Sequence, residues 1–294
     1  MTYARHDLVD DFDTLPRMPS WVTTTGIQAA EDAAFLSGAA LAHLHVVLAY
    51  TKAPQSLLRD RLALRAAEAC VEFSGRPERA ADLRDAVHLL RPGDLPGPAG
   101  ETYQAWRRAV ERTVSVNALH RMWPGSGAKR IAEWLDAGQG APVTRAAIVL
   151  ETILKEAPRA EGQALILADA VLAQALGWDH IVPLHAAGLK RADLCKRGAD
   201  LRLACHRAMA VSSIEAVRLA SDLVRRVERL RAVAPKLRAK AAGAAVEMFL
   251  TRDAVAPAAL PLPDRASRRL CDRLVELGAV RELTGRGTFR LYGV

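Results

Sequence analysis

The stretch that decides the fold is residues 264–294, which read DRASRRLCDRLVELGAVRELTGRGTFRLYGV. Asp264 is a residue type that caps helices, and the apolar residues after it recur at the three- and four-residue spacing of a helix. Gly278 comes at the point where a residue in the left-handed conformation readily ends a helix. The spacing therefore predicts a helix from about 265 to 277, with its apolar face made by Ala266, Leu270, Leu274 and Leu277.

Two short alternating segments follow this predicted helix. Residues 280–283 and 288–292 alternate with a period of two, and the turn residues Thr-Gly-Arg-Gly at 284–287 separate them. Alternation around a glycine-rich corner is typical of a β-hairpin. A helix that leads directly into a hairpin is the carboxyl half of a winged helix. The stretch before it, residues 236–250, has one broad apolar face and would supply the supporting helix, so we expect a winged-helix domain over residues 236–294.

The rest of the chain has the composition of a helical protein. Half of its 294 residues are apolar but only 5% are aromatic, so Ala, Leu and Val must build the core. Segments rich in Ala and Arg, with few Ile, Thr or Tyr, argue against an extensive sheet. We therefore expect an all-α fold. A flexible arm at residues 1–21 would precede a multi-helix bundle at 22–235, and the C-terminal winged-helix module would carry a small β-hairpin.

Positive charge is concentrated in the C-terminal quarter. From residue 221 onward, 15 Lys and Arg stand against 8 Asp and Glu, which is +7 of the chain's total of +8. Lysine and arginine displace condensed counterions from duplex DNA, so a basic helix and wing are typical of phosphate contact. The candidate DNA-binding residues are Arg265, Arg268 and Arg269 on the helix, Arg286 at the wing tip and Arg290 on the returning strand.

The same helix face also carries acidic groups. Asp272 and Glu276 fall among its arginines and would repel phosphates. Two interpretations of the module therefore remain open: it contacts DNA, or it docks protein, either a partner or a second copy of the chain. If it binds DNA, the exposed face offers no Asn or Gln for bidentate contact with adenine, so we expect binding by charge with weak base selectivity.

Few polar residues have the spacing of an active site. His88, Arg91 and Asp94 lie three residues apart, at a predicted helix end and in the proline-rich loop after it, and His185 could open a pocket between helices. These four residues are the candidate pocket of an enzyme. The structural alternative is that Arg91 pairs with Asp94 to stabilise the loop and that His185 is a satisfied core histidine. We favour a non-enzymatic binding or regulatory protein.

No cofactor and no metal site are expected. His43 and His45 are two residues apart, so on a helix their side chains diverge and cannot readily share a metal. The most apolar windows, 39–50 and 164–178, are too short to span a membrane, and the acidic first 20 residues do not resemble a secretory signal. Cysteines without a Cys-x-x-Cys pair are typical of reduced thiols in a cytoplasmic protein; here they are Cys70, Cys195, Cys205 and Cys271.

Two phrases resemble a known family. Residues 88–100, HLLRPGDLPGPAG, and residues 264–293, from DRASRRL to LTGRGTFRLYG, are similar to a bacterial family of unknown function whose members have similar length and are often plasmid-borne. This resemblance covers most of the chain and implies no established reaction. Plasmid-associated DNA binding is the function that it and the basic module together suggest.

A more distant resemblance concerns only the organisation of the chain. Helices that lead to a terminal winged helix resemble the architecture of Fic-type proteins, whose chemistry rests on a His-Pro-Phe-x-x-Gly-Asn-Gly-Arg loop. The nearest stretch, residues 180–191 with the sequence HIVPLHAAGLKR, lacks the Asn-Gly-Arg that cradles phosphates. Nucleotide transfer is therefore not expected.

Overall fold

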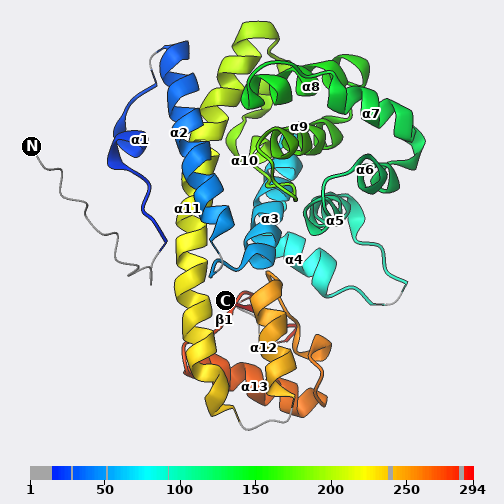
Figure 1. The fold of residues 1–294 in the computed structure, drawn as a ribbon. Coiled ribbons are helices and arrows are strands. Elements are labelled where there is room, and N and C mark those ends of the chain that lie inside the picture. The colour runs from blue at the N-terminus through cyan, green and yellow to red at the C-terminus, as the bar shows by residue number, and fades with distance from the viewer. Residues whose placement is uncertain (1–14, 28, 51, 92, 238–240, 285–287) are drawn as a thin grey trace, which may run out of the picture.

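The computed structural model describes residues 15–294 except 28, 51, 92, 238–240 and 285–287. Within that part the chain forms thirteen α-helices, four short 3-10 helices and one two-stranded sheet (Figure 1). The mostly helical fold confirms the all-α prediction.

The first half of the described chain contains α1 (Ser20–Thr24), α2 (Ala30–Ala49), α3 (Gln55–Phe73), α4 (Ala80–His88), α5 (Gly97–Glu111), α6 (Val116–Met122), η1 (Pro124–Ser126) and α7 (Ala128–Asp136). The second half contains α8 (Pro142–Glu156), α9 (Glu161–Ala175), α10 (His185–Gly188), η2 (Arg191–Cys195), α11 (Gly198–Val233), η3 (Ala234–Lys236), α12 (Ala242–Thr251), η4 (Pro257–Ala259), α13 (Asp264–Glu276), β1 (Arg281–Glu282) and β2 (Tyr292–Gly293).

Helix α11 runs along the length of the molecule. Its 36 residues extend over about 54 Å at the usual rise per residue. Figure 1 shows α2 beside its upper part and the segment from α12 to β2 beside its lower end. Helix α3 packs with α4 and α5, and α8 packs with α9 in the upper part of the body (Figure 1). One continuous apolar core includes residues from Leu15 to Val294, so α11 connects two ends of the same packed structure.

Helix α2 is long and apolar enough to span a membrane by length and composition. Here it packs lengthwise against α11 and buries residues such as Leu36, Leu44 and Val47. Phe35 and Val46 remain exposed on its outer side, where Trp21 of α1 stacks on Phe35 with ring centroids 5.5 Å apart. The helix therefore lies at the surface of the bundle, with one side in the core.

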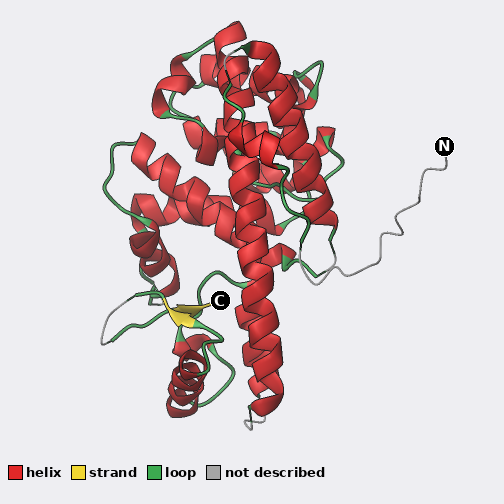
Figure 2. Cartoon of the chain, turned by 90° about the vertical axis from the view of Figure 1, so that its left-hand side faces the viewer, coloured by secondary structure: helices red, strands yellow, loops and turns green. Residues whose placement is uncertain are grey.

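In the C-terminal segment, residues 242–294, the part from residue 264 onward follows the predicted order of helix, strand and strand. Strand β1 pairs with β2 in antiparallel register, Arg281 opposite Gly293. Val255 also pairs with Tyr292, through backbone hydrogen bonds of 2.8 and 3.0 Å. The strands are shorter than the alternating segments suggested, because Phe289 has a positive φ of 55° and leaves the extended path. Figure 2 shows this small sheet above α13 at the lower end of the molecule.

The predicted capping role of Asp264 is wrong. Helix α13 begins at Asp264, and Pro263 occupies the N-cap position with φ −55° and ψ 142°. The Pro263 carbonyl accepts hydrogen bonds from the backbone of Ala266 and Ser267. Because the rigid proline ends the loop one residue earlier, the Asp264 carboxylate lies inside the first turn and pairs with Arg268 at 2.9 Å.

A buried charge network joins the C-terminal segment to α3, α4 and α5; we call it the Asp253 network. Asp253, just after α12, is fully buried, pairs with Arg61 and accepts bonds from Arg84 Nε at 2.6 Å and Nη2 at 3.1 Å. Its backbone N–H donates to Asp60 Oδ2 at 2.9 Å, and Asp60 Oδ1 accepts from Arg107 Nε at 3.0 Å. Burial opposes ionisation of Asp253, but the Arg84 hydrogen bonds and the Arg61 charge hold its pKa below the ordinary value.

A second buried pair lies in the body of the molecule. The Asp169 carboxylate, from α9, accepts hydrogen bonds from the backbone of Leu184 and His185 at 3.2 Å each. It also contacts His185 Nδ1 at 2.7 Å. Burial of His185 disfavours its charged form, yet the Asp169 charge and hydrogen bond outweigh burial and raise the pKa of the imidazole to about 10. The pair fixes the start of α10 to α9.

The Asp253 network predicts a large effect of Asp253→Asn on stability. Loss of this charge leaves Arg61 and Arg84 as buried cations without their carboxylate, which typically costs about 3–5 kcal/mol. The free energy of unfolding from urea titrations should fall by that order. The control is Asp264→Asn, which breaks an exposed ion pair and should cost less than about 1 kcal/mol. Equal losses for the two variants would contradict the role given to Asp253.

The His185 pair predicts a dependence of stability on pH. The unfolded imidazole has a pKa near 6.5, and in the folded protein it is about 10. The stabilisation is therefore fully present below pH 6.5 and is lost as the pH rises toward 10, on the order of 1–4 kcal/mol. Urea titrations of wild type and His185→Gln between pH 6 and 10 measure this. The stability difference between them should shrink as the pH rises, and a constant difference would refute the charged pair.

Candidate functional site

Helix α13 is strongly amphipathic. Ser267, Leu270, Cys271 and Leu274 are buried against the rest of the C-terminal segment. The opposite face is open to solvent at the lower end of the molecule, away from the helical body (Figure 1). This face carries, in order, Arg265, Arg268, Arg269, Asp272, Arg273 and Glu276, so the three arginines predicted to face outward do so.

Part of the charge on this face is neutralised within the helix. Arg268 pairs with Asp264 at 2.9 Å, and Arg273 pairs with Glu276 at 2.9 Å. Arg265 has no ion pair among the described residues, and the same holds for Arg269 one turn later. Exposed pairs of this type are weak and exchange readily with other anions. The helix therefore presents two uncompensated guanidinium groups and two that a phosphate could draw away from their partners.

The residues just before β2 approach the start of this helix, so Arg290, which was expected on the returning strand, lies outside it. Arg290 contacts Glu282 at 3.6 Å, and Phe289 beside it is 62% exposed. A groove of about 570 Å³ runs between them and α13, and its lining includes Asp264, Arg268 and Asp272. Helix α13 and the residues before β2 thus border one continuous concave surface. Arg286, predicted at the wing tip, lies outside the described residues.

The four residues of the predicted enzyme pocket do not form one site. His88 lies at the end of α4 with its ring against Tyr103, at 6.5 Å between centroids. The Asp94 carboxylate accepts a hydrogen bond from the backbone N–H of Arg91 at 3.0 Å, which stabilises the loop through its backbone. His185 belongs to the separate buried pair with Asp169. The three places share no cavity among those found in the described chain.

His88 has the environment of a neutral core imidazole. Burial, together with the positive charge of Arg107, lowers its pKa to about 4. Its Nε2 atom is buried and has no hydrogen-bond partner among the described residues. The imidazole of His88 is therefore neutral at neutral pH. It lies beside the Asp253 network.

The Asp253 network escaped prediction from the sequence. A signal was nevertheless present, because Arg59, Asp60 and Arg61 follow one another in a helix with leucines on either side, at 57, 58, 62 and 64. Three consecutive charged residues must place at least one on the buried face of such a helix. Asp60 and Arg61 are both buried, whereas their partner Asp253 is too distant in sequence to be paired with them by spacing.

Comparisons with known proteins give one family. The family model described as "Protein of unknown function (DUF1403)" matches residues 6–294, nearly the whole chain. No curated protein matches the chain. This match includes α13, both strands and both buried charge clusters. The chain therefore belongs to the DUF1403 family of proteins of unknown function.

Proposed function

We propose that residues 242–294 form a winged helix and that the protein binds duplex DNA through it, as a non-enzymatic regulatory protein of the cytoplasm. The order of elements supports the first part: α12, the paired residue Val255, η4, α13, β1 and β2. Val255 serves as the first strand because it pairs with Tyr292 of the last one. In this arrangement α13 takes the position of a recognition helix.

The observation that carries the proposal is the exposed arginine face of α13. Arg265 and Arg269 lie one turn apart on the outer side, with no ion pair among the described residues. The helix has 13 residues, about 20 Å in length, and a B-DNA major groove of about 12 Å width admits an α-helix. The groove between helix and wing continues this surface past Arg290. The shape of this surface is therefore compatible with contact to the phosphates of both DNA strands.

The charge of the whole segment favours the same partner. The net charge of +7 from residue 221 onward attracts the polyphosphate backbone at low ionic strength. The remaining 220 residues carry a net charge of +1. A plasmid-associated role, which the sequence resemblance suggests, is part of this proposal.

Protein docking is the second candidate, and it has an observation of its own. Val275 and Phe289 are 39% and 62% exposed beside the acidic residues Asp272 and Glu276. Exposed apolar side chains with mixed charge are more typical of a protein interface than of phosphate contact. The two candidates differ in their dependence on salt, which the following experiment measures.

The DNA proposal predicts a steep dependence of affinity on salt. Fluorescence anisotropy with the full-length protein and two labelled duplexes of unrelated sequence should give similar affinities for both. Arg265→Gln combined with Arg269→Gln should reduce the slope of log affinity against log salt by about two, since each lost phosphate contact removes about one unit. The matched control, Arg207→Gln combined with Arg218→Gln, removes the same charge from exposed positions of α11 and should leave the slope nearly unchanged.

Three outcomes would count against the proposal. Absence of binding to either duplex at low salt would eliminate DNA contact and favour protein docking. An equal change of slope in the control would assign the affinity to overall charge and not to α13. Tight binding to one duplex alone would contradict the weak base selectivity expected from the α13 side chains.

A further inference from the structure

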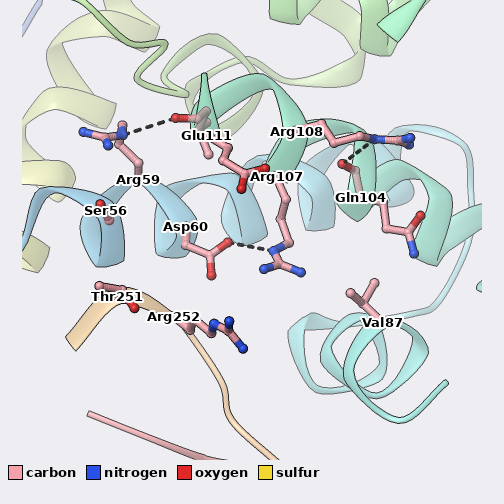
Figure 3. A pocket seen from close by; sticks show the side chains of 11 residues that line it. Ser56, Arg59, Asp60, Val87, Gln104, Arg107, Arg108, Glu111, Thr251 and Arg252 are labelled. Carbon is pink, nitrogen blue, oxygen red and sulfur yellow. Dashed lines mark hydrogen bonds and ion pairs between the residues drawn. The ribbon is translucent and has the colours of Figure 1, made fainter. Parts of the chain in front are cut away.

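A second positively charged concavity lies on the other side of the Asp253 network. This cleft, of about 620 Å³, opens between α3, α5 and the residues that follow α12. Figure 3 shows its polar side chains, with Arg107 and Arg252 reaching from opposite sides toward the same space. Four arginines line it: Arg59 from α3, Arg107 and Arg108 from α5, and Arg252 next to Asp253. Its size is that of a small-molecule site.

Three of these arginines are held in place through Nε, two by neutral backbone carbonyls and the third by its ion pair with Asp60. Arg59 donates Nε to the Val110 carbonyl at 3.2 Å, and Arg108 donates Nε to the Gln104 carbonyl at 3.2 Å. Arg107 donates Nε to Asp60. In each case the bond engages Nε and leaves the terminal Nη groups directed elsewhere. A guanidinium fixed at Nε is preorganised to bind an oxyanion with its other nitrogens.

The acidic groups of the cleft balance only part of this charge, since Asp60 and Glu111 stand against four arginines. Asp60 accepts a bond at each carboxylate oxygen, from Arg107 and from the Asp253 backbone. Glu111 is exposed. Arg252 has no ion pair or side-chain hydrogen bond among the described residues. Arg59 is partly buried, and its burial lowers its pKa, with no carboxylate in the described part of the chain to offset that effect. A bound anion would supply the missing counter-charge.

We propose that this cleft binds a small phosphate-bearing polyanion, with the Nη groups of Arg107 and Arg252 as its central contacts and those of Arg59 and Arg108 at either end. Ser56, Gln104 and Thr251 add neutral hydrogen-bonding groups to the lining. The lining contains no aromatic ring on which a nucleobase could stack, so recognition is directed at the anionic groups. This inference does not depend on DNA binding by α13.

The probe is inorganic pyrophosphate, titrated by calorimetry into the full-length protein without divalent cations and at constant ionic strength set with chloride. Wild type should bind it saturably. Arg108→Gln combined with Arg252→Gln should weaken binding at least tenfold, because charge-assisted bonds to phosphate are lost. Both residues are exposed, so the variant should unfold at the wild-type temperature. Arg59→Met is a second variant and should also weaken binding.

The control is again Arg207→Gln combined with Arg218→Gln, which should bind pyrophosphate like wild type. Orthophosphate should bind more weakly than pyrophosphate, since it reaches fewer arginines. Lack of saturable binding by wild type, or an equal loss in the control, would overturn the proposal. Equal or tighter binding of citrate would overturn the assignment to phosphate. If a DNA duplex displaces pyrophosphate, and the α13 variant still binds that duplex, the cleft is a site for nucleic acid and not for a small anion.

Failure here is distinguishable from failure of the DNA proposal. Arg265→Gln combined with Arg269→Gln changes only α13 and should leave pyrophosphate binding as it is in wild type. Loss of pyrophosphate binding in that variant would show that the anion binds at α13, which overturns the assignment to the cleft.

Discussion

The Asp253 carboxylate, buried between the guanidinium groups of Arg61 and Arg84, determines where the C-terminal segment lies on the helical body. A carboxylate without access to water requires such partners, since loss of one leaves an uncompensated buried charge. Two residues later Val255 pairs with Tyr292, and Tyr292 pairs with β1, which follows α13. The position of the arginine face of α13 thus depends, through a short series of backbone bonds, on one ion-paired residue.

The two positively charged surfaces of the molecule are related by this same junction. The exposed face of α13 lies beyond the small sheet, whereas the cleft lies on the side of α3 and α5, with Arg252 directly next to Asp253. Asp60 belongs to both the cleft and the network, because it accepts from Arg107 and from the Asp253 backbone. An anion in the cleft would therefore contact the body and the C-terminal segment at once.

Periodicity predicted most of the fold because it reports local burial. The expected helix at 265–277 is α13, shifted by one residue. Local pattern also placed the three α13 arginines on the outer face. It misjudged Asp264, because capping depends on the backbone angles of Pro263.

The charge network and the cleft could not be predicted, since Asp60 and Asp253 are 193 residues apart and no spacing rule connects them. The pocket assembled from His88, Arg91, Asp94 and His185 failed for the same reason, because proximity in three dimensions was assumed from sequence alone.

The arrangement around Asp253 also constrains how the family can change in evolution. Neither arginine can be replaced by a neutral residue while the carboxylate remains, and the carboxylate cannot be lost while both arginines remain buried. Simultaneous exchange for apolar residues of similar volume would be tolerated far better than any single step. Positions 61, 84 and 253 should therefore be inherited together, so that a lineage with a neutral residue at one of them is expected to have altered the other two.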